Sequence, residues 1–503
     1  MTELFSWQAL LALAAGGLYG AVFGSIPGLT ATLAVALFIP IAFFLDPILA
    51  LPAIISISAV AIYAGDVGSV IARIPGTPAS AAYVEELYAL ARRRDPGYAL
   101  GISAMGSAVG GVIGTALLIF SATSLAAVAK NFSSFEYFWI AVLGLTAGIF
   151  ASSGSSLKAL VSLLIGVMFS TAGVDPTLGY PRFDFGNPNL LGGLNYIVAM
   201  IGLFGFSEVL QNVFARGDVE GKDMPRSRGA PTWQFFIRPV RLMLRNKFLV
   251  VRSSLIGTFV GFLPGAGADI GAWVSSSFEK LSGKRSEQDE ESDDRVILAG
   301  TSSNNAAVAS AWIPALSLGL PGDTVTAIVL GVFLMKGITP GPMLFETQAT
   351  LVWSLFGAFL IANIVLLPLF GFLTARIATF VVRIPFNLLL GVIAGLCVVG
   401  AYAINNNPFD VAVMVTMGLF AFLLRIGGFP LAQVVLGMVL GPILEVNFMV
   451  SAIKSRWDLT AFFDRPIAIG LMIGTLVVVV IGLRIKARAA SAVRATQRQQ
   501  SQD

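Results

Sequence analysis

The chain contains no histidine and only one cysteine, Cys397, among its 503 residues. These absences exclude disulfide bonds within the chain, zinc sites built from histidine or several cysteines, and nucleophiles activated by histidine. Any proton-coupled step would have to use a carboxylate. Serine and aspartate are present, but without such partners they give little support to an intramembrane hydrolase, and the sequence predicts a protein that is not an enzyme.

Charge is also scarce. Charged residues make up 12% of the chain and hydrophobic residues 56%, whereas soluble domains carry about 25% charged residues. Uncharged runs near or above the roughly 20 residues that span a bilayer recur along the whole sequence. They cover 7–45, 47–65, 97–129, 137–157, 185–207, 296–322, 347–375, 384–409 and 466–483. We therefore expect an all-α polytopic membrane protein with about 12 to 14 membrane segments, some of them half-helices.

The basic residues are concentrated in two places. Nine lysines and arginines but only three acidic residues lie between Arg216 and Arg252, and five more arginines and lysines follow position 483. By the positive-inside rule, both the mid-chain linker and the C-terminus face the cytoplasm. These clusters flank spans and lack interleaved aromatic residues at base-stacking spacing, so no nucleic-acid partner is expected.

One stretch occurs twice. Gly20–Thr32 contains Ile26-Pro27-Gly28, and the altered copy Gly257–Asp269 contains Leu263-Pro264-Gly265. Two further pairs follow in the same order at nearly constant separation, Pro75-Gly76 with Pro321-Gly322 and Pro96-Gly97 with Pro340-Gly341. Three matching landmarks indicate a duplicated chain of two homologous repeats. We expect the repeats to be inverted, although the half-helices prevent a count of the crossings between equivalent landmarks.

The repeat suggests four regions. We expect a first membrane repeat over 1–215, a basic linker with an amphipathic arm over 216–246, a second membrane repeat over 247–485 and a basic cytoplasmic tail over 486–503. The arm begins near Trp233, where aromatic residues alternate with arginines in the pattern of a helix lying on a membrane surface.

Each Pro-Gly landmark reads as an interrupted or re-entrant helix, because proline removes a backbone donor and glycine frees φ. Such interruptions occur at membrane depth only when they are buried in protein or line a cavity, and paired interruptions indicate the binding site of a secondary transporter. An anion would be attracted to the half-helix N-termini. The candidate substrate-binding residues are Pro27, Gly28, Thr30, Thr32, Gly76, Thr77, Pro264, Gly265, Gly267, Asn304, Asn305, Gly322 and Thr324. The alternative is that the glycines serve only close packing.

Five polar residues in apolar surroundings are candidate ligands of a coupling ion, with sodium as the expected ion. They are Asn304, Asn305, Asp269, Asp323 and Asp66. Intramembrane carboxylates are costly enough to indicate function. The structural alternatives are a helix cap for Asp269 and Asp323, an ion pair or an interfacial position for Asp66, and a lock between helices for the two asparagines.

The glycines at 101, 106, 110, 111 and 114 form a small-residue face suited to close helix packing.

The paired interrupted helices and the polar residues near them favour a carrier that moves an organic anion by alternating access. An ion channel or passive anion pore would share duplicated broken helices and remains the alternative.

At these motifs the chain resembles the large membrane subunit of the tripartite tricarboxylate transporters, the TctA-type permease. The segments that carry the resemblance are 20–32, 74–80, 257–269, Asn304-Asn305 with Pro314, 318–322 and 337–342. The resemblance implies a multi-pass permease of the bacterial inner membrane that imports di- or tricarboxylates on an ion gradient, with Na⁺ as coupling ion and without ATP. It also implies two partners, a small four-span membrane subunit and a periplasmic solute-binding protein. Related sequences place Pro-Glu shortly before the paired asparagines, whereas this chain has Gly300-Thr301-Ser302-Ser303, which puts the substrate and the coupling stoichiometry in doubt.

Overall fold

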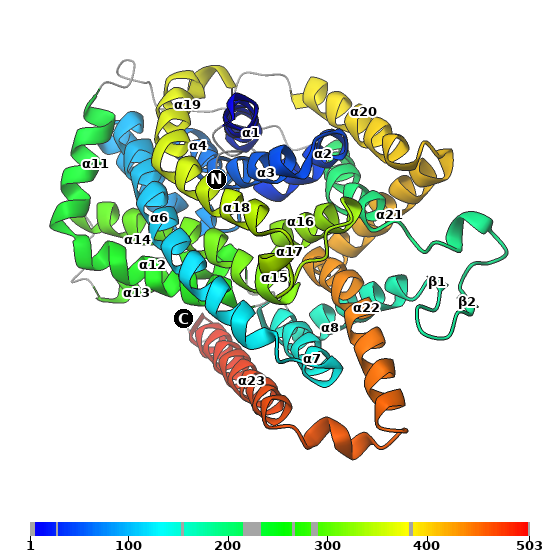
Figure 1. Ribbon diagram of the computed structural model, residues 1–503. Helices are drawn as coiled ribbons and strands as arrows, with labels where there is room; N and C mark the ends of the chain where they lie inside the picture. Colours follow the sequence, from blue (N-terminus) through cyan, green and yellow to red (C-terminus); the bar gives the residue numbers. More distant parts are fainter. Residues whose placement is uncertain are drawn as a thin grey trace. The chain divides into compact units, whose positions relative to one another are not determined.

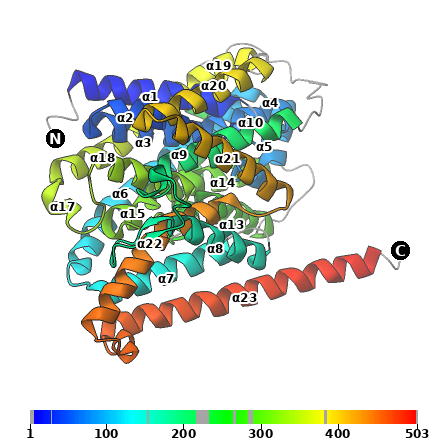
Figure 2. The same ribbon diagram turned by 90° about the vertical axis from the view of Figure 1, so that its right-hand side faces the viewer.

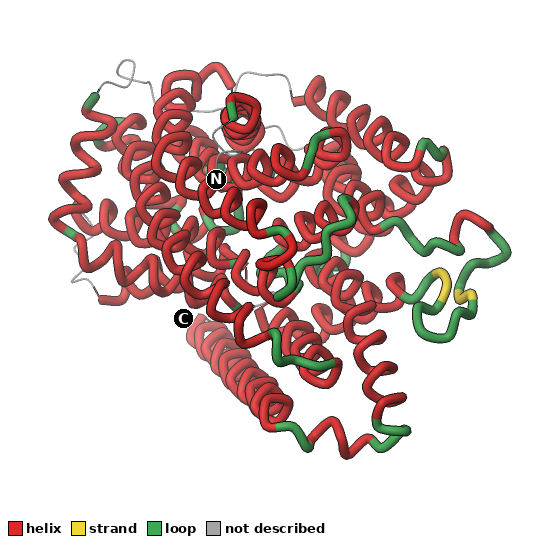
Figure 3. Tube along the Cα trace, in the orientation of Figure 1, coloured by secondary structure: helices red, strands yellow, loops and turns green. Residues whose placement is uncertain are grey.

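The computed structural model describes residues 6–26, 29–151, 155–214, 233–263, 267–282, 290–381 and 386–500. Nearly all of this part of the chain is helical (Figure 3). The only strands in these ranges are β1 (Gly173–Val174) and β2 (Pro181–Arg182), which pair antiparallel with Gly173 opposite Arg182. The expected all-α class is therefore confirmed.

Most of the helices follow one another with short connections, except across the long loop over 171–195 (Figure 1). Up to residue 214 the α-helices are α1 (Trp7–Ser25), α2 (Ala31–Phe44), α3 (Pro47–Ala64), α4 (Asp66–Ala72), α5 (Val84–Arg93), α6 (Pro96–Ala129), α7 (Ser134–Ala151), α8 (Ser156–Ser170), α9 (Tyr196–Met200) and α10 (Ser207–Phe214). From residue 233 they are α11 (Gln234–Arg245), α12 (Lys247–Phe262), α13 (Gly267–Ser282), α14 (Glu290–Ser310), α15 (Trp312–Leu318), α16 (Thr324–Met335), α17 (Leu344–Thr347), α18 (Ala349–Ile361), α19 (Leu367–Val381), α20 (Phe386–Asn405), α21 (Pro408–Ile426), α22 (Leu431–Lys454) and α23 (Pro466–Gln500). Short 3-10 helices are η1 (Ser80–Ala82), η2 (Pro188–Leu190) and η5 (Leu459–Phe463), and π-helical turns are η3 (Ile201–Phe206) and η4 (Ala362–Leu366).

Within the described residues, eight helices are long and apolar enough to cross a membrane, and five shorter apolar helices accompany them. The chain is thus a multi-pass membrane protein, as its composition predicts. The number of membrane segments and the inverted relation of the repeats stay predictions.

The chain forms two compact units. Unit 1 consists of residues up to 130, 194–263 and 267–426, and unit 2 contains 131–193 and the chain from 427 onward. Unit 1 therefore draws its helices from both of the repeats that the sequence predicts. All the described candidate site residues lie in unit 1.

Close packing in unit 1 depends on glycine. In α1, a Cβ added at Gly20 or Gly24 would lie 2.6 or 2.4 Å from the carbonyl oxygen of Ile57 or Ala61 in α3. In the second repeat, Gly257 of α12 meets the backbone of Ser303 in α14 in the same way. Small residues one turn apart let helix backbones approach, which is how helices associate in lipid. The two repeats thus begin with the same kind of glycine-lined helix pair.

Helix α6 packs against the adjacent face of α14. A Cβ at Gly110 or Gly114 would lie 2.0 or 2.6 Å from the carbonyl oxygen of Ser302 or Ala306. The expectation that the glycines of this segment serve close helix packing is confirmed at these positions. As a result α14, which carries Asn304 and Asn305, lies between α6 of the first repeat and α12 of the second.

In unit 2, α22 packs on α7 and α8, and α23 packs on α7. Figure 2 shows α23 as one long helix, and only 6% of its apolar stretch Pro466–Arg484 is buried within the chain. Most of the surface of this apolar stretch is therefore available to lipid or to another subunit. The loop between α8 and α9 carries the two short strands.

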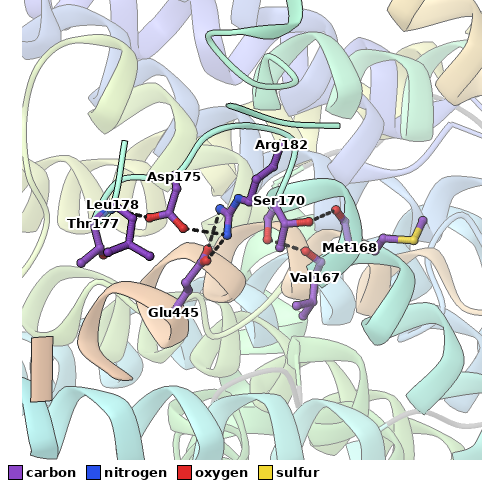
Figure 4. Close-up of polar contacts among 9 residues, drawn as sticks. Val167, Met168, Ser170, Asp175, Thr177, Leu178, Arg182 and Glu445 are labelled. Carbon is purple, nitrogen blue, oxygen red and sulfur yellow. Dashed lines mark hydrogen bonds and ion pairs between the residues drawn. The ribbon is translucent and has the colours of Figure 1, made fainter. Parts of the chain in front are cut away.

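Arg182 holds this loop in place. Figure 4 shows its guanidinium between Asp175 and Glu445, at 3.1 Å from Asp175 Oδ2 and with Nη2 donating to Glu445 Oε2 at 3.2 Å. The backbone N–H groups of Leu178 and Thr177, together with Arg182, lower the pKa of Asp175. The ion pair of Arg182 with Glu445 therefore anchors the loop to α22, while Asp175 holds Arg182 from within the loop.

Candidate functional site

The interruption at Pro75-Gly76 lies between α4 and η1. Helix α4 ends at Arg73, which adopts the left-handed conformation with φ 58°, and Ile74 N then donates to Gly68 O. Gly76 lies so close to the end of α3 that a Cβ there would be 2.6 Å from the Cα and the oxygen of Gly65. Only glycine fits this approach, so the Pro-Gly pair folds the chain back against α3.

The second repeat builds the same turn. Helix α15 ends at Gly319 with φ 71°, and Leu320 N donates to Pro314 O. A Cβ at Gly322 would lie 2.6 Å from the Cα and the oxygen of Ala311. Each contact of the first turn has a counterpart at the same separation in the sequence. The repeat seen in the sequence is thus also a repeat of local geometry.

The other pair of interruptions separates α1 from α2 and α12 from α13. Pro27, Gly28, Pro264 and Gly265 lie outside the described residues. After the interruption in the first repeat, Thr30 caps α2 by accepting from Leu33 N at 3.2 Å. After the interruption in the second repeat, Gly267 begins α13 with φ 72° and donates its N–H to Gly322 O at 3.3 Å. The two interruptions of the second repeat therefore lie beside each other.

Side chains next to these turns meet across the repeats. Thr32 Oγ1 of α2 lies 3.2 Å from Thr324 Oγ1 of α16, and the two helices run side by side (Figure 1). The residue of the second repeat that is equivalent to Thr32 is Asp269 of α13. Its Oδ1 accepts from Ala79 N at 3.1 Å. Each repeat thus places the start of its second helix on the Pro-Gly turn of the other.

The asparagine pair of α14 is buried and contacts α3 of the first repeat. Asn304 and Asn305 are each 2% exposed, and Asn305 Nδ2 donates to Ala59 O of α3 at 3.4 Å. Ala59 precedes Asn305 by 246 positions, which is also the separation of Gly76 from Gly322. Asn305 Oδ1 is buried without a hydrogen-bond partner. A buried amide oxygen without a partner is costly, so this atom is a candidate for contact with a ligand.

A third part of the candidate site is the buried carboxyl group of Asp66. It is 1% exposed at the start of α4. Ser80 Oγ donates to its Oδ1 at 2.5 Å, Ser103 Oγ donates to its Oδ2, and Tyr83 OH lies 3.3 Å from both oxygens. Thr77 Oγ1 lies 2.8 Å from Ser80 Oγ and accepts from Ser80 N, so this predicted residue helps position Ser80. The carboxylate is surrounded by hydroxyl groups.

Asp323 has a local role. It caps α16, accepting from Thr326 N at 2.7 Å, while Thr326 Oγ1 accepts from Asp323 N at 2.9 Å. This is a capping box, the structural alternative considered above. Asp269 lies near enough to Asp323 for their charges to interact unfavourably.

Three residues around Asp66 were not predicted as site residues. Ser80, Tyr83 and Ser103 belong to η1, to the start of α5 and to α6. Serines are common in apolar helices, and Tyr83 precedes a charged amphipathic helix, so neither type is conspicuous in the sequence. A buried carboxylate with no neighbouring base in the sequence is the signal that would have prompted a search for hydroxyl partners.

Comparison with known proteins identifies the family of the chain. Residues 10–436 match the family described as "Tripartite tricarboxylate transporter TctA family". An uncharacterized 52.8 kDa protein in the TAR-I ttuC' 3'region of Agrobacterium vitis is 34% identical over 477 residues, covering 93% of this chain and 92% of that protein. A second uncharacterized protein, in the TAR-II ttuC' 3'region of the same organism, is 37% identical over 232 residues, which cover 45% of this chain and 93% of that protein.

No solved structure matches the chain. The family match covers most of the chain, including both sets of Pro-Gly turns and the asparagine pair, and the larger relative is similar over nearly its full length. The resemblance predicted from these motifs is confirmed. The chain belongs to the tripartite tricarboxylate transporter TctA family, and it is a membrane permease of that transporter family.

Proposed function

We propose that this permease imports di- or tricarboxylates by alternating access, with Na⁺ as the coupling ion, and that its two repeats are inverted in the membrane. The observation that carries the proposal is the mutual contact of the interrupted helices. Thr32 meets Thr324, and the residue in the position of Thr32 in the second repeat, Asp269, meets the turn of the first. Reciprocal contacts of this kind are expected of two repeats related by an approximate two-fold axis.

The contact of Asn305 with Ala59 supports the same relation. Residues at equivalent positions of two repeats touch each other only when they lie beside the axis that relates the repeats. Asn305 and Ala59 therefore mark the place where the repeats meet, inside unit 1. A binding site at a repeat interface is typical of secondary transporters, and reorientation of the repeats would open such a site to either side.

The chemistry of this place suits a carboxylate. Thr32, Thr324 and the asparagine pair offer hydroxyl and amide donors. Helix α16 begins at Thr324, and its N-terminus favours negative charge. No lysine or arginine is among the candidate site residues. We propose that the substrate is held by these neutral donors and by helix N-termini, with the coupling cation balancing part of its charge.

The family assignment supports two partners, a small four-span membrane subunit and a periplasmic solute-binding protein that selects the carboxylate. We propose that the three proteins act together in the bacterial inner membrane, with the linker and the C-terminus of this chain in the cytoplasm. The arginines and lysines around 216–252 support this orientation.

The test is transport by the purified three-component system in proteoliposomes. Labelled carboxylate should accumulate when Na⁺ is supplied outside and should not when K⁺ replaces it. Unlabelled carboxylate inside should drive entry of the label by counterflow, and the flux should saturate. Flux that neither saturates nor shows counterflow would replace the carrier with a passive pore, and uptake indifferent to Na⁺ would remove the ion assignment.

A further inference from the structure

Asp66 combines complete burial with an unusual set of partners. Its neighbours within hydrogen-bonding distance are three hydroxyl groups, from Ser80, Tyr83 and Ser103. In the described part of the chain, no lysine or arginine forms an ion pair with it. The nearest arginine in the sequence, Arg73, pairs with Glu85 instead, and both of those side chains are more than half exposed. The charge of Asp66 is thus solvated by neutral donors alone.

A carboxylate in this position needs a cation. Burying an isolated charge in low dielectric is expensive, and within membrane proteins such residues pair with an opposite charge or mark an ion path. Hydroxyl groups lower the cost, but they leave the net charge in place. Since no basic side chain supplies the opposite charge, the group is either a neutral acid or a carboxylate paired with a bound cation. Hydroxyl groups donate to both of its oxygens, which stabilises the ionised form and supports the cation.

The surrounding atoms indicate which kind of cation would bind. All four groups present oxygen, and Ser69, one turn along the same face of α4, has a fully buried hydroxyl without a partner. Carboxylate and hydroxyl oxygens are hard ligands, which suit small hard cations and not the metals bound by sulfur or imidazole. One carboxylate among neutral oxygens matches a single positive charge. We infer that Asp66, Ser80, Tyr83 and Ser103 form a Na⁺ site.

This inference rests on the proposed sodium-coupled function and gives it a location. It also selects among the carboxylates that the sequence singles out, because Asp323 is engaged in capping α16 and Asp269 in accepting from Ala79 N. The four oxygen-bearing residues come from α4, η1, the start of α5 and α6. A cation held among them would fix the first Pro-Gly turn against α6.

Tyr83 connects the site to the asparagine pair. Its hydroxyl is hydrogen-bonded to Asp66 and lies close enough to the Asn304 side chain to interact with it. Its ring approaches α14 at Gly300, where a Cβ would lie 2.3 Å from the ring. Occupation of the Asp66 site would orient the Tyr83 hydroxyl and with it the Asn304 amide. The site thereby couples Na⁺ binding to the place proposed for the carboxylate.

The test measures cation binding without transport. Thermal unfolding of the purified full-length permease is followed at fixed pH and ionic strength while NaCl replaces choline chloride or KCl. Because a ligand that binds only the folded state raises the melting temperature, Na⁺ should stabilise the wild type and K⁺ should not. Asp66→Asn should abolish the effect of Na⁺. Ser103→Ala and Tyr83→Phe, which keep the charge, should raise the half-saturating Na⁺ concentration about tenfold, equivalent to about 1.4 kcal/mol.

Thr115→Val is the matched control. Thr115 is buried in the same helix as Ser103, but its hydroxyl donates to Gly111 O of its own helix. This variant should respond to Na⁺ as the wild type does. If Asp66→Asn does not fold, the two charge-conserving variants decide the question.

Three results would overturn the site. Equal stabilisation of the wild type and of the Asp66, Ser103 and Tyr83 variants would place Na⁺ elsewhere and leave sodium-coupled transport intact. Absence of any Na⁺ effect on the wild type would refute the site directly. Stabilisation that follows pH and ignores Na⁺ would make Asp66 a proton carrier instead. Failure of carboxylate transport with Na⁺ binding retained would instead count against the proposed function alone.

Discussion

The hydroxyl oxygens of Thr32 and Thr324 lie 3.2 Å apart although 292 positions separate them in the chain. Thr32 follows Pro27-Gly28 in the first repeat, and Thr324 follows Pro321-Gly322 in the second. The contact joins α2 to α16. It links the interrupted helices of the two repeats through their side chains, and the first prediction concerns it.

Thr32→Cys combined with Thr324→Cys, in a Cys397→Ala background, should form a disulfide under mild oxidation. The bond should stop transport if the helices must separate during the cycle, and a reductant should restore it. The measurement is carboxylate uptake before and after oxidation, with cross-linking read from protease-cut protein on a gel. Thr32→Cys with Thr326→Cys is the control, because Thr326 faces Asp323. Efficient cross-linking without loss of transport would show that the two helices move together.

The Pro-Gly turns should be intolerant of side chains. Gly76→Ala and Gly322→Ala would each force a Cβ to within 2.6 Å of backbone atoms, and overpacking of this kind costs about 1–3 kcal/mol. Both variants should therefore unfold at lower temperature than the wild type in detergent. Gly395→Ala is the matched control, because nothing lies within 4 Å of the Cβ it would add and alanine favours a helix. A melting temperature unchanged in all three variants would contradict the described turns.

Loss of the asparagine amides should weaken substrate binding without unfolding the protein. Asn304→Ala and Asn305→Ala should each raise the half-saturating carboxylate concentration about 10- to 100-fold, since hydrogen bonds to charged groups contribute about 1.5–3 kcal/mol. Asn363→Ala is the comparison: Asn363 is equally buried, but its amide donates to Phe359 O within its own helix segment. Undiminished affinity in the Asn304 and Asn305 variants would remove both residues from the site.

The orientation of the chain makes a prediction that is independent of transport. One candidate span, Tyr196–Phe214, separates the loop that carries Phe185 from the basic linker. With the linker in the cytoplasm, Phe185 lies on the periplasmic side, and its side chain is 84% exposed. In a Cys397→Ala background, Phe185→Cys should react with an impermeant thiol reagent added to spheroplasts, and Ser227→Cys should react only after lysis. The opposite pattern would invert the proposed topology.

Residues that act through local backbone chemistry were predictable from the sequence. Proline and glycine mark turns wherever they occur, so the turns at Gly76 and Gly322 and their repetition could be predicted before any fold was known. The helical class followed equally from the long uncharged runs. Residues whose role depends on tertiary contact were not predictable. Ser103 meets Asp66 only because α6 packs beside α4, and nothing in the sequence distinguishes it from the other serines of its helix.

The same distinction explains Asp323. Its sequence context allows both a helix cap and an ion ligand, and only the geometry of Thr326 reveals the capping box. The division of unit 1 and unit 2 is also tertiary. The chain from 131 to 193 lies inside the first predicted repeat, yet it packs with residues from 427 onward, which no linear pattern indicates.

If interrupted helices from both repeats enclose one carboxylate site, a cryo-electron microscopy map of the complex with a bound tricarboxylate will show it. Ligand density should contact Asn305 and at least one Pro-Gly turn from each repeat, near Gly76 and Gly322. Density confined to one repeat, or lying away from both turns, would contradict it.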